Sequence, residues 1–171
     1  MTSDERDRQF TEWVRDHAAI LERTARAFAV PRDREDLLQE LLIAVWKAVP
    51  AFRGDCRPAT FLYRVTHNAA LTWKRARRDD GRLESLEPPA GEPRREPTAP
   101  PEPADDRERL ELLYAGIRRL PPLDRSLLLL SLDGVAYGEI AALHGLTVSN
   151  VGARLTRARQ RLALDLERRT T

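Results

Sequence analysis

Residues 137–161, YGEIAALHGLTVSNVGARLTRARQR, contain two helical patterns separated by a short turn. Gly145 is suited to a left-handed stop after the first helix, and Thr147 is suited to cap the second. In the second helix, apolar side chains recur at spacings of three and four residues and leave the opposite face polar. A helix, a tight glycine turn and an outward-polar helix predict a helix-turn-helix unit.

The second helix of this unit is rich in arginine. A helix of this kind fits the major groove of DNA, and its cations can contact phosphates and base edges: Arg154, Arg157, Arg159 and Arg161. The alternative is a plain helical hairpin with a solvated arginine face, since arginine-rich amphipathic helices are common. The residue pattern favours DNA binding and leaves the alternative open.

Helical spacing of apolar residues continues through the N-terminal part of the chain. The pattern predicts three helices in residues 1–83: one that ends at Pro31, one capped by Asp33 that ends at Pro50, and one that starts near Pro58. No segment of the sequence alternates apolar and polar residues with a period of two. We therefore expect an all-α fold.

Residues 84–108 differ from the rest of the chain in composition. They hold seven of the twelve prolines and eight acidic against three basic side chains, with almost nothing apolar after Leu86. Such a segment cannot bury enough surface to offset its ordering entropy. It predicts a flexible Pro-rich acidic linker, extended by roughly 3 Å per residue, that holds two small helical domains apart, residues 1–83 and 109–171.

The composition excludes several classes of protein. The chain has 171 residues, 33% of them charged, and no run of about 18 apolar residues, so no membrane insertion is expected. The start, MTSDERDRQF, lacks the pattern of a secretory signal, which predicts a cytoplasmic protein. The single Cys56 cannot form an internal disulfide, and three scattered histidines lack zinc-ligand spacing. We expect neither a metal nor a cofactor.

Two polar clusters in the N-terminal block have alternative interpretations. The basic run that ends the third helix lies near Trp73 and Asn68, a combination suited to unpaired bases, or it is a helix-end charge run that complements the helix dipole. Asp36, Gln39 and Glu40 share one face of the second helix, and the two acids could suggest acid-base catalysis. Catalysis is disfavoured, because no nucleophile, phosphate-binding glycine loop or metal-ligand cluster accompanies the acids. The same polar stripe is a reasonable surface for docking a protein.

Several fragments follow one another in a specific order. In the N-terminal block they are REDLLQE (34–40) with Trp46, FRG (52–54), and TFLYRV (60–65) with Asn68. In the C-terminal block they are Leu120-Pro121 with Arg125, YGEIA (137–141) and VGARLTRAR (151–159). In this order, with a Pro-rich acidic segment between the blocks, they resemble the extracytoplasmic-function (ECF) sigma factors, two-domain subunits of bacterial RNA polymerase in the sigma-70 superfamily.

The resemblance implies a region-2 helical bundle in residues 1–83 and a region-4 helix-turn-helix domain in residues 109–171. It implies contacts to the clamp helices of core RNA polymerase by Asp36, Gln39, Glu40 and Trp46. It implies contacts to the promoter minus-ten element by Arg53, Arg57, Asn68, Arg75, Arg77 and Arg78. It implies contacts to the minus-thirty-five element by Thr147, Ser149, Asn150, Arg154, Thr156, Arg157 and Arg161.

The resemblance also implies partners and a function. The rest of region 4 is expected on the polymerase flap, and an anti-sigma factor is expected to control the protein. No catalytic residue is implied, since the polymerase performs nucleotidyl transfer. The implied function is that of an alternative sigma factor, which directs promoter recognition, DNA melting and transcription initiation.

The sequence departs from the family pattern in the recognition helix, where Gly152 and Ala153 replace the usual Lys or Arg and Ser. Two other functions stay open. A sigma-like regulator would bind DNA or polymerase without melting promoters. A two-component output regulator would share the helix-turn-helix but needs an α/β receiver, for which residues 1–83 show no strand pattern.

Overall fold

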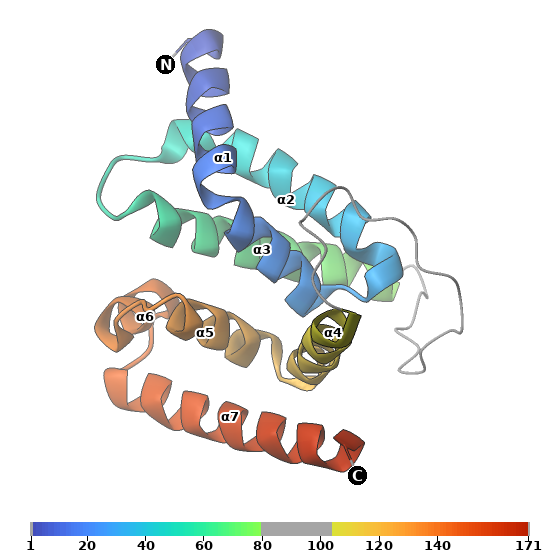
Figure 1. Cartoon of the computed structure of the whole chain (residues 1–171). Helices are drawn as coiled ribbons and strands as arrows, with labels where there is room; N and C mark the ends of the chain where they lie inside the picture. Colours follow the sequence, from blue (N-terminus) through green and yellow to red (C-terminus); the bar gives the residue numbers. More distant parts are fainter. Residues whose placement is uncertain (1, 80–103, 171) are drawn as a thin grey trace.

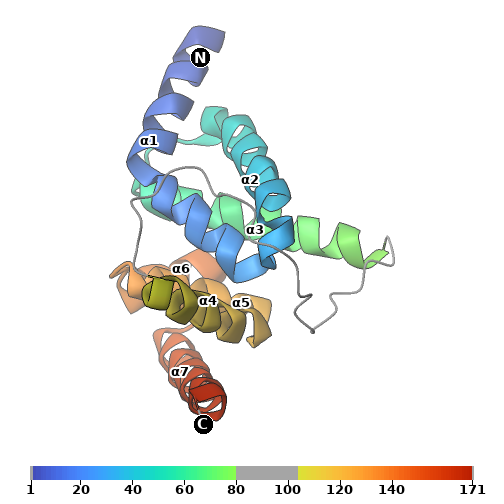
Figure 2. The same cartoon turned by 45° about the vertical axis from the view of Figure 1, so that its right-hand side comes forward.

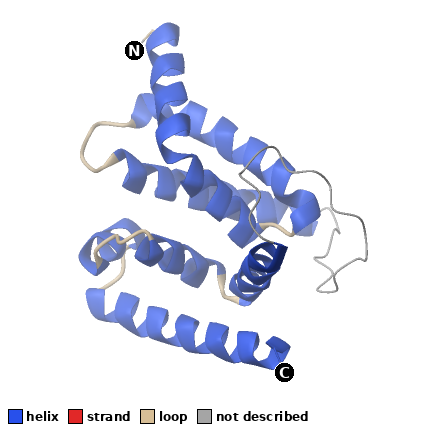
Figure 3. Ribbon diagram, viewed as in Figure 1, coloured by secondary structure: helices blue, strands red, loops and turns tan. Residues whose placement is uncertain are grey.

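The computed structural model describes residues 2–79 and 104–170, and all regular structure in these residues is helical (Figures 1 and 3). The α-helices are α1 (Ser3–Phe28), α2 (Arg34–Ala48), α3 (Pro58–Asp79), α4 (Ala104–Arg119), α5 (Pro122–Leu132), α6 (Tyr137–His144) and α7 (Val148–Thr170). Two short 3-10 turns, Pro31–Asp33 and Val49–Ala51, flank α2. The predicted all-α fold is confirmed.

Helices α1, α2 and α3 pack against one another as a three-helix bundle. Leu37, Leu41 and Val45 line the buried face of α2 at intervals of four residues, as the sequence pattern predicted. At the end near the α2–α3 loop, Trp13 packs edge-on against Phe52, with ring centroids 5.0 Å apart. Because these large side chains fill the centre, the polar faces of α2 and α3 are left on the surface.

The start of α2 differs from the prediction. Asp33 was expected to cap this helix, but its side chain makes no capping hydrogen bond. The 3-10 turn that begins at Pro31 places Asp33 in a helical conformation, whereas a capping residue usually has extended backbone. Its carboxylate instead accepts a hydrogen bond from Arg77 of α3 at 2.6 Å.

Helices α6 and α7 form the predicted helix-turn-helix and pack with α4 and α5. Gly145 ends α6 with φ of 65°, the left-handed conformation that glycine adopts without a steric cost. The Thr147 hydroxyl accepts a hydrogen bond from the backbone N–H of Asn150 at 3.1 Å and so caps α7. Both sequence predictions for this turn are confirmed.

The two helical blocks are in direct contact, with α4, α5 and α6 as a middle layer between the α1–α3 bundle and α7 (Figures 1 and 2). The expectation that the linker holds the blocks apart is therefore wrong for this structure. Leu127, Leu128, Leu129 and Leu130 are four consecutive buried residues, so α5 is covered all round. It packs on α7 on one side and on α1 and α3 on the other.

Polar contacts also cross between the blocks. Asp133, at the end of α5, accepts hydrogen bonds from Arg23 of α1 and from the Tyr63 hydroxyl of α3. Arg34 of α2 donates to Glu111 of α4 at 2.5 Å. The pattern of each block alone contains no information about these pairs.

The predicted linker lies mostly outside the described residues, which omit 80–103. Residues 104–108 were assigned to this linker, but they form the first turn of α4. A segment assigned to the linker by its acidic composition therefore begins the first helix of the C-terminal block.

Candidate nucleic-acid interface

Helix α7 presents the predicted polar face away from its buried side. Val151, Leu155 and Ala158 are buried, while Asn150 and Arg157 are exposed. The other exposed residues predicted to contact the upstream element are Thr147, Ser149, Thr156 and Arg161. The N-terminal half of the helix thus has an exposed face that is polar apart from Val148, which is 54% exposed, and such a face suits a major groove.

Two arginines of this helix are turned toward neighbouring helices. Arg154 donates to the Asp124 carboxylate of α5 at 2.8 Å and to Asn150 Oδ1 at 3.2 Å. Arg159 donates to the Ser131 hydroxyl at 2.8 Å. The sequence placed both guanidinium groups with the DNA-facing arginines, and the structure instead gives them contacts within the C-terminal block. Helical spacing does not reveal this, because a long side chain on the edge of a polar face can turn either way.

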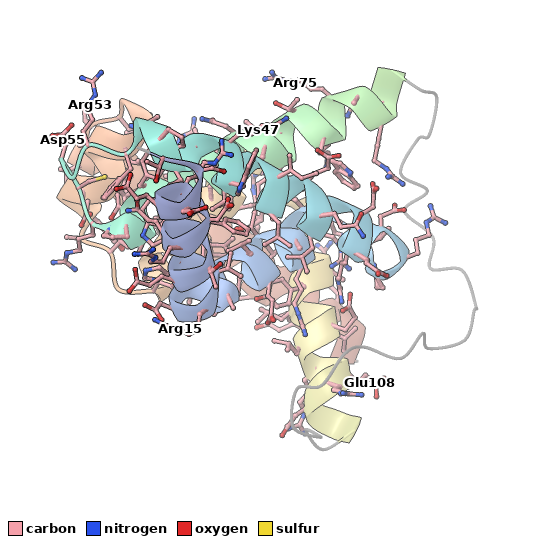
Figure 4. The ribbon with its side chains drawn as sticks, turned by 90° about the horizontal axis from the view of Figure 1, so that it is seen from above. Arg15, Lys47, Arg53, Asp55, Arg75 and Glu108 are labelled. Carbon is pink, nitrogen blue, oxygen red and sulfur yellow. The ribbon has the colours of Figure 1, made fainter. Side chains whose placement is uncertain are left out.

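The candidates for the downstream element lie along α3. Arg53 and Arg57 are exposed on the loop before this helix, where Gly54 has φ of 79°. Figure 4 shows Arg53 at one end of the region and Arg75 at the other, both pointing away from the body of the molecule. The 22 residues of α3 span about 33 Å, so the two basic groups lie at the two ends of an extended surface.

Asn68 and Arg78 are also exposed on α3. The Asn68 backbone carbonyl accepts from the Thr72 hydroxyl at 3.0 Å. Because Asn68 is exposed, its side-chain amide lies on the surface between the two basic ends, a position suited to contacting an unpaired base.

Arg77 has a different environment from its basic neighbours. It donates to Asp33 at 2.6 Å and to Asp36 at 2.8 Å, and its guanidinium lies 4.6 Å from the centroid of the Trp73 ring. The Trp73 indole N–H also donates to Asp36, at 2.8 Å. For Arg77 these contacts favour a role in fastening α3 to α2, and they join Asp36, a predicted polymerase contact, to a predicted DNA contact.

The outward face of α2 carries Gln39 and Glu40, both exposed. Ile43, which is 45% exposed, continues this face but was not among the predicted polymerase contacts. Its spacing of three residues from Glu40 and four from Gln39 could have identified it. A polar stripe with one exposed apolar side chain is suited to docking a protein helix.

Trp46 is the fourth predicted polymerase contact, and the N-terminal part of α1 covers it. Its indole N–H donates to Asp7 at 2.9 Å, and the Arg6 guanidinium lies 3.6 Å from the ring centroid. Backbone angles at His17 break the helical conformation inside α1, and the segment before this kink reaches past the bundle (Figure 1). In this arrangement the Trp46 ring contacts Arg6 and Asp7 of α1.

A pair of histidines lies where α3 meets α5 and α6. The rings of His67 and His144 pack edge to face with centroids 5.2 Å apart, and the Ser126 hydroxyl is hydrogen-bonded to His67 Nδ1. Burial, with a smaller contribution from His144, lowers the pKa of His67 from its ordinary value to about 4. Burial also lowers the pKa of His144. Both rings are therefore held neutral at neutral pH.

Within residues 2–79 and 104–170, no group of three or more His, Cys, Asp or Glu side chains is arranged to hold a metal ion. In the same residues, no helix combines the length and apolar character needed to cross a membrane. Cys56 lies half-buried in the loop before α3.

The fold and its surfaces define a class: an all-helical protein that joins a helix-turn-helix to a three-helix bundle with an exposed polar face on α2. Family models agree, since the Sigma-70 region 2 model matches residues 13–79 and the Sigma-70, region 4 model matches residues 110–162. The ECF RNA polymerase sigma-E factor of Escherichia coli (strain K12) is 32% identical over 135 residues, which cover 75% of this chain and 71% of the relative. The ECF RNA polymerase sigma factor SigE of Mycolicibacterium smegmatis is 34% identical over 156 residues, covering 88% of this chain and 59% of that one.

Solved structures show the same fold. The sigma factor RpoE in complex with the anti-sigma factor NepR from Bartonella quintana superposes with a TM-score of 0.68 at 19% identity, over 93% of this chain and 97% of that chain. CnrH in complex with the cytosolic domain of CnrY gives a TM-score of 0.59 at 28% identity, over 94% and 89% of the two chains. The chain belongs to the ECF sigma factors of the sigma-70 family. It is an alternative sigma factor that directs transcription initiation.

Proposed function

We propose that this sigma factor works through three separate surfaces. The outward face of α2, with Gln39 and Glu40, docks on the clamp helices of core RNA polymerase. The Phe52–Arg57 loop and the exposed side of α3 hold the minus-ten element, and Asn68 captures a base flipped from the duplex. The N-terminal half of α7 recognises the minus-thirty-five element.

The observation that carries this proposal is the division of α7 into a buried apolar side and an exposed polar strip that begins at a capped N-terminus. Val151 and Leu155 are fully buried, while Asn150 and Arg157 are exposed. Recognition helices use this arrangement to place short side chains against base edges while the opposite side packs on the domain. The solvated-hairpin alternative does not require a polar strip aligned with a capped helix start.

We further propose that the described arrangement is a closed form that opens on the promoter. Elements centred near minus ten and minus thirty-five lie about 25 base pairs apart, or roughly 85 Å at 3.4 Å per pair. The α3 helix that is proposed to hold one element packs directly on α5 of the block that is proposed to hold the other. Separation of the two blocks would let both elements be bound at once.

The partners proposed are core polymerase, promoter DNA and a protein of the anti-sigma class. Both solved structures described above are complexes with a second protein, and in one of them the pair is a sigma factor with an anti-sigma factor. The chain is proposed to act in the cytoplasm, with no catalysis of its own, because the polymerase carries out nucleotidyl transfer.

Core-dependent run-off transcription tests the function. The full chain is added to core polymerase with a library of promoters randomised at both elements, and transcripts identify the active sequences. Specific initiation that depends on both elements is expected. A chain that binds polymerase or DNA yet yields transcripts only from templates already mismatched near the start site would instead be a regulator that does not melt promoters.

A further inference from the structure

Three side chains from α5 and α7 form a continuous chain of hydrogen bonds that ends on the proposed recognition surface. Asp124, in the first turn of α5, is buried, and its Oδ1 accepts from Arg154 Nη1 at 2.8 Å. Arg154 Nε donates to Asn150 Oδ1 at 3.2 Å, one turn earlier on α7. Asn150 itself is exposed. A buried carboxylate is thus connected to an exposed amide through one guanidinium.

The chemistry of the guanidinium sets the orientation of the amide. Arginine has five N–H donors and no acceptor, so the Asn150 atom that faces Arg154 is the carbonyl oxygen. The NH2 group of Asn150 therefore lies on the other branch of the amide, away from Arg154. Asn150 presents two donors to whatever meets this part of α7.

Donors recognise only some base edges. In the major groove, acceptors are found at guanine O6 and N7, adenine N7 and thymine O4, whereas cytosine presents a donor at N4. An Asn150 amide held with its oxygen toward Arg154 discriminates in favour of an acceptor edge. An amide free to rotate by 180° would accept from a donor edge as readily.

The ion pair also removes one cation from the DNA surface. The Arg154 side chain is 31% exposed and the Asp124 side chain 10% exposed, and the two are in contact at 2.8 Å. While the guanidinium is held by this carboxylate, it is turned toward α5. Without the carboxylate charge, it could swing to a phosphate and add a contact that carries no sequence information.

We propose that Asp124 is a positioning residue for recognition of the upstream element: through Arg154 it fixes Asn150 as a hydrogen-bond donor, so that Asn150 selects a base edge bearing an acceptor. This inference rests on the proposed function, in which α7 contacts that element. It changes the role expected for Arg154 from a DNA contact to a link between two other residues.

The test uses the full chain assembled with core polymerase and duplex probes. Sequences are first selected from duplexes with a randomised upstream element, and single-base variants of the selected duplex are then compared at several salt concentrations. Four variants are measured: Asn150→Asp, Asp124→Asn, Arg154→Lys and, as a matched control, Ser131→Ala. The control removes the 2.8 Å contact between Arg159 and α5 but leaves Asn150 and its partners unchanged.

Each variant has its own expected pattern. Asn150→Asp replaces the outward donors by an acceptor and should abolish the preference at one base position. Asp124→Asn should reduce the preference at that same position about 5- to 10-fold, and should steepen the dependence of log K on log salt by about 0.9, for one added phosphate contact. Arg154→Lys keeps a cation beside Asp124 but lacks the Nε–H fork. It should therefore reduce the base preference at the same position without steepening the salt dependence. Ser131→Ala should change neither the base preference nor the salt dependence.

The outcomes separate this inference from the proposed function. A wild-type holoenzyme that selects no upstream sequence would overturn both. If a sequence is selected and Asn150→Asp alters one position, but Asp124→Asn and Arg154→Lys leave that position unchanged, only the positioning role is overturned. The positioning role is also overturned if Ser131→Ala reduces the base preference at that position as strongly as Asp124→Asn does. Should Asp124→Asn lose its helical melting transition, Arg154→Lys decides the question.

Discussion

Acidification is expected to open the contact between the two helical blocks, because that contact keeps His67 neutral. Burial lowers the pKa of His67 to about 4 from an ordinary value of 6.5, while an open form that exposes the ring would restore the ordinary value. The open form then binds the proton more readily than the closed form. The free energy that favours the closed form is therefore fully present above pH 6.5 and decreases as the pH falls from 6.5 toward 4. At pH 5 the closed form has lost about 2 kcal/mol of stability relative to the open form, which is a 30-fold change in the closed-to-open ratio.

The environment of the ring supports this sign. His67 of α3 contacts Ser126 of α5 and the His144 ring of α6, and the Phe28 ring of α1 lies 6.1 Å away between centroids. None of these neighbours is an anion that could stabilise an imidazolium. Burial also lowers the pKa of His144, so its protonation acts in the same direction.

Pulsed dipolar EPR measures the effect directly. Nitroxides are attached to Cys56 in the N-terminal block and to a cysteine introduced at exposed Gln160 on α7. The distance distribution should shift toward longer values between pH 7.5 and pH 5. His67→Gln combined with His144→Gln should remove most of this shift, and His17→Gln, in α1, should retain it. A distribution that does not change with pH, or a shift that persists in the double variant, would refute the reasoning.

Three further predictions concern α7, α3 and α5. Arg157→Ala should cost about 1–3 kcal/mol of binding to a selected upstream element and relax discrimination, as measured by titration of duplex probes; an equal loss on scrambled DNA would make Arg157 a phosphate contact only. Asn68→Ala should keep the helical melting transition and polymerase binding while open-complex formation on a paired promoter falls, as followed by permanganate footprinting; wild-type opening would contradict base capture. Leu129→Ala, at a side chain only 2% exposed, should lower the free energy of unfolding by about 2–5 kcal/mol in chemical denaturation, and a loss below 1 kcal/mol would contradict the packing of α5.

Most of the helices could be predicted from the sequence, because their causes are local. Gly145 ends α6 in the left-handed conformation and Thr147 caps α7, as their residue types favour. Asp33 shows the limit of such reasoning. Its position before a helical pattern predicts a cap, but the turn that starts at Pro31 and a basic partner on a distant helix, Arg77, direct its carboxylate elsewhere.

The candidate site was predictable to a similar depth. The exposed face of α7 follows from the spacing of its apolar residues, so the exposure of Asn150 and Arg157 could be predicted. The engagement of Arg154 by Asp124 was not predictable, because the two residues are 30 positions apart and meet only when α5 packs on α7. The covering of Trp46 by Arg6 and Asp7 is a contact of the same kind.

The sequence by itself determined the helical fold, the helix-turn-helix and the family, since periodicity, caps and motif order are properties of residues near one another in the chain. Only the tertiary structure decided that the two blocks touch. The run Leu127–Leu130 buries side chains all round α5, but a run of leucines does not specify which helices cover it. Asp133 shows the same dependence, because its partners, Arg23 and Tyr63, come from two helices of the other block. Contacts between distant segments depend on the shape and charge of both surfaces at once, and that information exists only after the chain has folded.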